Sequence, residues 1–187
     1  VAALTLFIAL SPWWDRALVT LYMATFGVIV SCLIGFTVGT LCFQNKKSAA
    51  FMLGVCDIFQ TFPSFVYLIP VMMLFGITDT SVLIAVIVYA TIPATRYTIE
   101  GLRSVPVGLH EAATMSGVNK FQRLTKIEFP LAFPHMMLGL NQTIVFALFM
   151  VIIGAFIGTE DLGQYILKAL SDKNGAGIGL TLGICVA

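Results

Sequence analysis

Side chains that could contact a polar solute are concentrated in two apolar stretches of this chain. They are Asp57, Gln60, Thr61, Phe62 and Pro63 in the stretch 49–76, and Asn141 and Gln142 in the stretch 131–157. An ionisable group in such a stretch is costly to leave unpaired in lipid, so it marks a candidate functional site. Amides, hydroxyls and aromatic rings bind a solute without breaking its bonds. We predict these residues as candidates for a translocation path, and we predict no catalytic residue.

Asp57 also has a structural interpretation, which we favour. Its place early in the apolar stretch puts it near a membrane interface, where it would cap a helix or form a salt bridge with Arg96 or Arg103. A paired carboxylate at an interface stabilises the fold locally and has no direct part in transport.

The neighbouring candidates allow two interpretations as well. Gln60, Thr61 and Pro63 either open a break in their helix, which frees carbonyls toward the path, or accompany a proline kink that other helices accommodate. Asn141 and Gln142 either face the path or hydrogen-bond between helices, which is the commoner use of such residues.

The elements that must position these residues are membrane helices. Of the 187 residues, 59% are hydrophobic and 10% are charged, whereas an ordinary soluble domain has roughly 25% charged residues. A bilayer core about 30 Å thick needs about 20 mainly apolar helical residues. The full candidates are 17–43, 49–76, 81 to about 97 and 131–157, with a last run from Ala176 and a helix tail at 1–10. We predict an all-α, polytopic transmembrane helical bundle.

The chain opens at Val1 and stops at Ala187 inside an apolar run, so we expect a fragment of a longer protein. We expect residues 1–187 to form a single transmembrane domain. The net charge of +1 is too small for a nucleic-acid partner. The four cysteines lie singly, without histidines at ligand spacing, so we expect no metal site.

The distribution of Lys and Arg predicts the orientation, because positive charges in short loops favour the cytoplasmic side. One set of segments carries Lys46, Lys47, Arg96, Arg103, Lys120, Arg123 and Lys126, and the other carries Arg16, Lys168 and Lys173. The richer set should be cytoplasmic, which places the long loop at about 98–128 inside the cell.

That loop is predicted to form two short helices joined by a turn. Pro106 can open the first helix, and Gly117 can end it. The second helix would cover 120–128 and end at Phe129-Pro130. Such a knob would either enter a groove on another protein or lie as an amphipathic hairpin on the lipid headgroups, and the pattern supports both about equally.

A motif within the loop separates these alternatives. The loop contains Glu111-Ala112-Ala113, three residues, Gly117, nine residues, Ile127, one residue and Phe129-Pro130. This spacing resembles the EAA loop of bacterial ATP-binding-cassette importer permeases, with Phe129 in place of a leucine as the departure. The resemblance implies five core helices per subunit and a coupling helix that docks on a separate ATPase. It assigns ATPase coupling to Glu111, Ala112, Ala113, Gly117, Ile127 and Pro130.

The resemblance also implies the partners. These are cytoplasmic ATP-binding subunits and a second permease subunit, expected to be a copy of this chain. No Walker-type Gly-rich Lys-Ser/Thr sequence occurs in the chain, so ATP and Mg are expected on the partner ATPase and this chain is expected not to be an enzyme.

A second resemblance covers most of the chain. The stretches 57–76, Gly139-Leu-Asn-Gln-Thr143 and Asp161-Leu-Gly-Gln164 are similar to permeases of glycine betaine and proline betaine importers. This implies uptake of a methylated-amine osmolyte (glycine betaine, proline betaine, choline, carnitine or trimethylamine N-oxide) across the bacterial inner membrane, with an extracytoplasmic substrate-binding protein or domain. Phe62 would then offer a π-face to a quaternary ammonium group. The alternative is a secondary transporter of a small polar solute, driven by an ion gradient, for which Asp57 is the candidate ion site.

Overall fold

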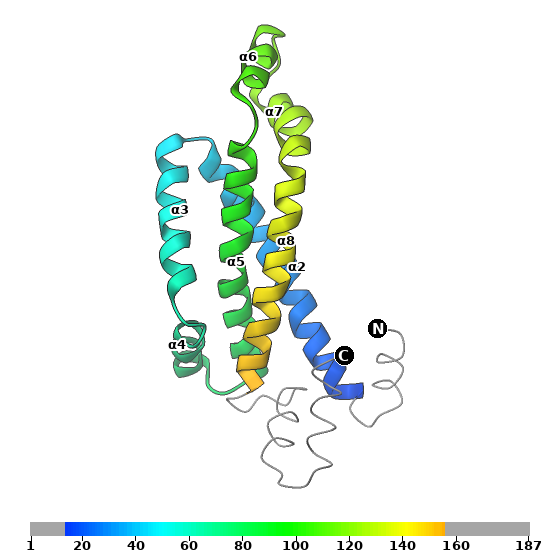
Figure 1. The fold of residues 1–187 in the computed structure, drawn as a ribbon. Helices are drawn as coiled ribbons and strands as arrows, with labels where there is room; N and C mark the ends of the chain where they lie inside the picture. The colour runs from blue at the N-terminus through cyan, green and yellow to red at the C-terminus, as the bar shows by residue number, and fades with distance from the viewer. Residues whose placement is uncertain (1–13, 156–187) are drawn as a thin grey trace. The chain divides into compact units, whose positions relative to one another are not determined.

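The computed structural model describes residues 14–155, and these form helices joined by short connections (Figure 1). The elements in chain order are α2 Trp14–Phe43, α3 Lys46–Thr61, α4 Phe65–Phe75, α5 Asp79–Arg103, α6 Val107–Met115, α7 Lys120–Arg123, the π-helix η1 Leu124–Glu128 and α8 Phe129–Ala155. The predicted runs at 1–10 and from Ala176 lie outside the described residues.

In this part of the chain, three helical stretches are long and apolar enough to cross a membrane. They are Ala17–Phe43, Asp79–Arg103 and Lys120–Ala155, and the bent pair α3 and α4 makes a fourth if counted as one span. Large side chains stay exposed on them: on α2, Leu21, Leu33 and Leu41 are each more than 60% exposed. Lipid can cover such a surface, whereas water would oppose it. The predicted all-α membrane fold is confirmed.

One predicted boundary was wrong, and the structure decides between the two alternatives left open for the second span. The third span was expected to end near Tyr97, but α5 continues to Arg103, so residues 98–103 belong to the span and the loop begins later. Pro93 lies inside α5 and does not end it. The second span was predicted as one run with either a break or a kink. It has a break, because α3 ends at Thr61 and Phe62 is already extended, with φ −74° and ψ 138°. An extended residue before Pro63 avoids the clash that a proline makes with a preceding helical residue.

Contacts divide the described residues into two compact units. In the first, which contains residues 14–27, Ser64–Tyr89 and 147–155, the start of α5 is central. Its Val82 and Val86 are almost fully buried. A Cβ placed on Gly27 of α2, or on Gly154 of α8, would lie 2.5 Å from Cγ1 of one of these valines. Glycines therefore let both helices approach α5 closely.

The second unit contains Val28–Pro63 and Ala90–Phe146. Here the end of α5 is central, with α8 beside it at Gly139, where a Cβ would lie 2.6 Å from Tyr97 Cβ. A buried cluster forms where α5 and α8 meet the end of α2. Its members are Leu102, Ala132 and Met136, with Phe36, Phe43 and Leu124 packed against it.

Two glycines on α2 set its contact with α5. A Cβ on Gly35 would lie 2.9 Å from the Thr95 amide nitrogen, and a Cβ on Gly39 would lie 2.7 Å from Thr98 Cβ. Our sequence analysis did not use this signal, although Gly-xxx-Gly spacing is a known feature of close helix pairs in membranes.

We expect Gly35→Leu to separate α2 from α5 and destabilise the protein. Overpacking a tight contact costs about 1–3 kcal/mol, so thermal unfolding of the detergent-purified full-length protein should occur several degrees lower. Gly54→Leu adds the same side chain on α3 at a site with no atom within 4 Å. Equal losses in the two variants would contradict the packing explanation.

Candidate functional site

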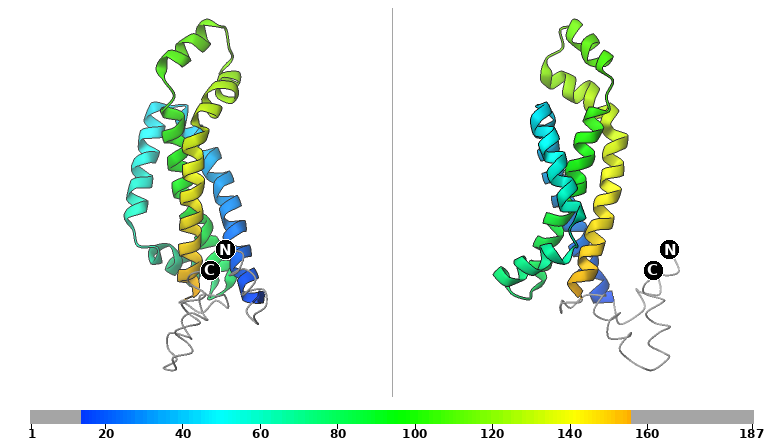
Figure 2. Two further views of the ribbon diagram at one scale, coloured as in Figure 1. Left: turned by 45° about the vertical axis from the view of Figure 1, so that its right-hand side comes forward. Right: turned by 60° about the vertical axis from the view of Figure 1, so that its left-hand side comes forward.

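The segment between α5 and α8 forms a hairpin, residues 104–128, which we call the α6–α7 hairpin. Both of its short helices lie beyond the end of α5 (Figure 1, Figure 2). Pro106, which was predicted to open this helix, is the N-cap residue of α6, one position before its first helical residue. Its ψ of 136° turns the chain out of α5 and into α6. The predicted pair of helices and turn is confirmed.

The turn after α6 depends on Gly117. Its φ is +70°, a left-handed conformation that residues with a Cβ seldom adopt. The amide of Gly117 donates to the Thr114 carbonyl (3.1 Å), and the amide of Val118 donates to the Ala113 carbonyl (3.2 Å). This is the Schellman arrangement, which satisfies the last carbonyls of a helix. Next, the amide of Asn119 donates to Gln122 Oε1 (3.2 Å) at the start of α7, so both ends of the turn are fixed.

The residues that the motif assigns to coupling do not all lie on the surface. Glu111, Ala112 and Gly117 are exposed, and Pro130 is exposed at the start of α8. Ala113, in contrast, is only 4% exposed, so its methyl group packs inside the hairpin. Ile127 is half-buried. The exposed face of α6 therefore presents Glu111 and Ala112.

The second arm of the hairpin differs from the prediction. The predicted helix at 120–128 is present, but its second half is the π-helix η1, and it continues into α8 without ending at Phe129-Pro130. The Phe129 amide donates to the Leu124 carbonyl, five residues earlier. Pro130 lies in the first turn of α8, directly after the π-helix. A missing backbone donor is tolerated at that position. The hairpin and α8 are consequently one continuous helical element.

A buried carboxylate holds that element together. Glu128 is 2% exposed, and its Oε1 accepts a hydrogen bond from Arg123 Nε at 2.9 Å. Sequence reasoning did not single out this pair, which lies five residues apart as π-helical spacing favours.

A second polar site joins α3 to α5. Arg96 Nη1 donates to Asp57 Oδ1 (2.6 Å) and to Gln60 Oε1 (2.8 Å), while its Nε donates to Glu100 Oε1 (3.0 Å). We call Asp57, Gln60, Arg96 and Glu100 the Arg96 cluster. The predicted pairing of Asp57 with Arg96 is confirmed, and Arg103 does not share it. Because Arg96 lies seven residues before Arg103, the last residue of α5, the two residues are about 10 Å apart along the helix axis.

The cluster forms one wall of a cavity of about 260 Å³. Three of its members line it together with Tyr97, Gln142 and Phe146. Two predicted path residues, Gln60 and Gln142, are thus brought together. The other predicted path residues do not line this cavity. Asn141 is exposed, and Thr61, Phe62 and Pro63 are exposed at the break after α3.

Sequence reasoning missed the other lining residues as path candidates. A charged pair four residues apart in an apolar helix, as Arg96 and Glu100 are, was the available signal. Tyr97 and Phe146 gave none, because aromatic residues in apolar runs are common. Among the described residues, no three His, Cys, Asp or Glu side chains gather at a spacing that could hold a metal ion.

These features define a class. Apolar spanning helices, a charged cluster along a span and a hairpin beyond the helix ends are the architecture of a polytopic helical membrane protein. In its fold the chain is similar to a subunit of the MetNI methionine ABC transporter in inward-facing conformations. In one crystal form the TM-score is 0.78 at 21% identity, covering 92% of this chain and 87% of that one.

The chain belongs to the family of binding-protein-dependent transport system inner membrane components, whose model matches residues 27–187. It is 89% identical, over its whole length, to a trimethylamine N-oxide transport system permease protein, TmoV, of Pelagibacter ubique. The TmoV of Ruegeria pomeroyi is 49% identical over 96% of the chain. The glycine betaine/proline betaine permease ProW of Escherichia coli is 37% identical over 84% of the chain and 44% of ProW.

These relatives are permease subunits, and the family is one of inner-membrane components, so the predicted family and membrane location are confirmed. The chain spans 26% of the Pelagibacter protein and 27% of the Ruegeria protein.

Proposed function

We propose that this chain is the membrane-spanning permease part of an ATP-driven importer for small methylated amines. Trimethylamine N-oxide is the first candidate solute, because two relatives, 89% and 49% identical, are named for its transport. Glycine betaine is the second, through ProW. The proposal concerns the importer as a whole, in which this chain would form the membrane-spanning part.

The observation that carries the proposal is the exposed α6 helix with its glycine turn. Glu111 and Ala112 lie on the surface of a hairpin beyond the end of α5. A small side chain allows close approach by a partner, and a carboxylate offers it a charge-assisted hydrogen bond. We propose that a cytoplasmic ATPase, which binds ATP and Mg, docks on this exposed face of α6. Ile127 in η1 and Pro130 at the start of α8 would then help to set the conformation of the segment that connects the hairpin to α8.

The way in which the hairpin is connected supports an alternating-access mechanism. Its second arm runs through η1 into α8 without interruption, so a displacement of α6 would be transmitted to a spanning helix. In this proposal, ATP binding closes the ATPases, and the hairpins of two permease subunits, expected to be copies, move their spans around a shared path. An external binding protein would deliver the solute.

The cavity beside the Arg96 cluster suits such a solute. Trimethylamine N-oxide carries a hydrogen-bond-accepting oxygen on a nitrogen that bears three methyl groups. Among the described residues no group accepts from Arg96 Nη2, so this nitrogen can donate to that oxygen. Tyr97 and Phe146 line the cavity, and aromatic rings there would contact the methyl groups. We propose that Gln60, Gln142 and Asp57 act here, the last by holding Arg96 in place.

We expect the full-length protein, reconstituted in proteoliposomes with its ATPase and binding protein, to accumulate radiolabelled trimethylamine N-oxide only when ATP is supplied. An imposed Na⁺ or H⁺ gradient without ATP should give no uptake, because the coupling element is a docking helix. Unlabelled glycine betaine, choline and carnitine, added in turn as competitors, would rank the solutes. Accumulation with a gradient alone would contradict the proposal and favour a secondary transporter.

A further inference from the structure

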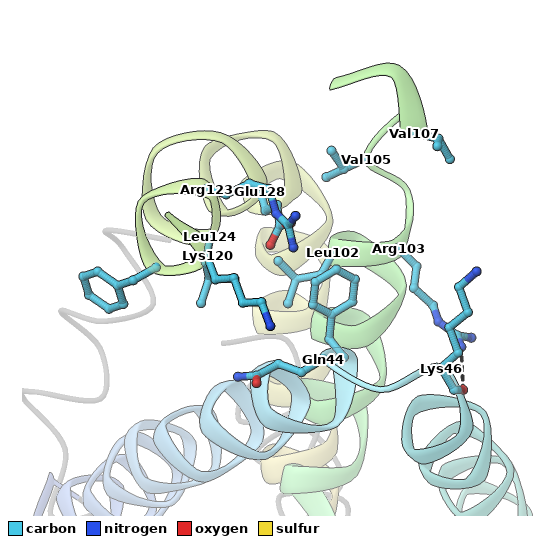
Figure 3. A pocket seen from close by; sticks show the side chains of 12 residues that line it. Gln44, Lys46, Leu102, Arg103, Val105, Val107, Lys120, Arg123, Leu124 and Glu128 are labelled. Atoms are coloured by element: carbon cyan, nitrogen blue, oxygen red, sulfur yellow. Dashed lines mark hydrogen bonds and ion pairs between the residues drawn. The ribbon is translucent and has the colours of Figure 1, made fainter. Parts of the chain in front are cut away.

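A cavity larger than the one beside Arg96 lies between the α6–α7 hairpin and the ends of the spans. Its volume is about 840 Å³. The walls come from the end of α2, the start of α3, the end of α5 with the link that follows it, the first residue of α6, and the second arm of the hairpin (Figure 3). All these segments belong to the second unit. We call this cavity the basic pocket.

Its charge is strongly one-sided. Lys46, Arg103, Lys120 and Arg123 line it, against a single acid, Glu128, which is already paired with Arg123. Arg103 Nη2 donates to the Lys46 carbonyl at 3.2 Å, a contact that neutralises no charge. Within the described part of the chain no carboxylate pairs with Lys46, Arg103 or Lys120. Lys120 lies on the hairpin side of the pocket, and Lys46 and Arg103 lie together on the other side (Figure 3).

The remaining walls are mostly apolar. Phe43, Leu102, Val105 and Leu124 line the pocket, and Leu102 belongs to the buried cluster of this unit. Cations beside an apolar surface suit a ligand that has an anionic head and a hydrocarbon body. A free inorganic anion would use only the cations.

The position of the pocket also indicates a lipid. Phe43 and Arg103 are the last residues of two helices that can span a membrane, and Lys46 is the first residue of α3. Residues at the ends of spans lie at the level of the lipid headgroups. The face of α6 proposed to meet the ATPase, with Glu111 and Ala112, is not part of the wall.

We propose that the basic pocket binds the phosphodiester headgroup of an anionic phospholipid, with Lys46, Arg103 and Lys120 as its ligands. Basic pockets between spans on the cytoplasmic side are suited to such headgroups. A zwitterionic lipid fits less well, because its own cation would meet three unpaired positive charges. A bound headgroup would contact the hairpin, α3 and α5 at once, so the lipid would stabilise the position of the hairpin relative to these helices.

The test uses the full-length protein, purified in detergent and supplied with phosphatidylglycerol, with phosphatidylcholine, or with inorganic phosphate. Native mass spectrometry measures retained lipid, and thermal unfolding measures stabilisation. We expect phosphatidylglycerol to be retained and to stabilise. Lys46→Gln, Arg103→Gln and Lys120→Gln should each weaken retention about fivefold, since a basic residue near a lipid surface contributes about that factor.

Lys47→Gln and Lys126→Gln are matched controls. Each removes one positive charge from an exposed side chain of α3 or η1, and neither residue lines the pocket. They should retain phosphatidylglycerol like the unmodified protein. The proposal would be overturned by equal losses in controls and pocket variants, by equal retention of phosphatidylcholine, or by equal stabilisation from inorganic phosphate alone.

Discussion

Gly117→Val is expected to reduce coupled transport strongly while the subunit still inserts into the membrane. The left-handed backbone at this position, with φ +70°, costs a residue with a Cβ about 1–2 kcal/mol. A β-branched side chain is a stronger outlier there. The turn would therefore lose its shape, and with it the fixed direction of α6. ATP-dependent uptake in proteoliposomes should fall by about tenfold or more, whereas the amount of protein in the membrane should change little.

Three further variants show whether conformation or bulk causes this loss. Gly117→Asn should retain most uptake, because asparagine tolerates the left-handed region. Gly117→Trp should combine the strain with bulk on the proposed docking face and uncouple ATP hydrolysis from uptake. Gly108→Ala is the control: Gly108 lies in α6 with no atom within 4 Å and no positive φ. Full uptake by the valine or tryptophan variant would refute the assigned role of the turn.

Arg96→Gln is the second substitution with a large expected effect. It removes the guanidinium that holds Asp57, Gln60 and Glu100 at 2.6–3.0 Å. Two carboxylates would then lose their positive partner along a span. An ionisable group without compensation at membrane depth costs about 2.5–3.5 kcal/mol on insertion scales. We expect a lower unfolding temperature and at least about tenfold less uptake. Arg96→Lys should recover part of the stability, since it restores the charge without the planar fork.

A double-mutant cycle tests whether the cluster acts as one unit. Asp57→Asn combined with Arg96→Gln leaves one fewer unpaired carboxylate, so the double variant should be more stable than the sum of the two single losses predicts. Thermal unfolding of the four proteins gives the coupling energy. Strict additivity would show that the contact between Asp57 and Arg96 contributes little to stability.

The two sites differ in how much of them could be predicted. The turn at Gly117 is specified by nearby residues: an Ala-rich helix, a glycine that permits positive φ, and a new helix start at Asn119. Each is a short-range signal, so the hairpin was predicted at nearly its observed place. The π-helix η1 was not, because an extra residue in a helical turn leaves no mark in a pattern of apolar spacing.

The Arg96 cluster was predictable only in part. Asp57 was singled out by its charge, and Arg96 was one of two named partners. Glu100 had a local signal in its spacing from Arg96, but nothing local assigns Tyr97 or Phe146 to the same cavity. Arg96 and Asp57 are separated by 39 positions in the chain, and their contact depends on how α3 packs beside α5.

By itself, the sequence determined that this protein is helical and lies in a membrane, and where its hairpin turns. Those properties follow from composition and from conformational preferences that act within a few residues. Only the tertiary structure decided that Ala113 faces inward, that glycines of α2 set its distance to α5, and that four basic residues surround one pocket. Each of these depends on side chains from separate helices meeting, and the packing of helices determines which of them meet.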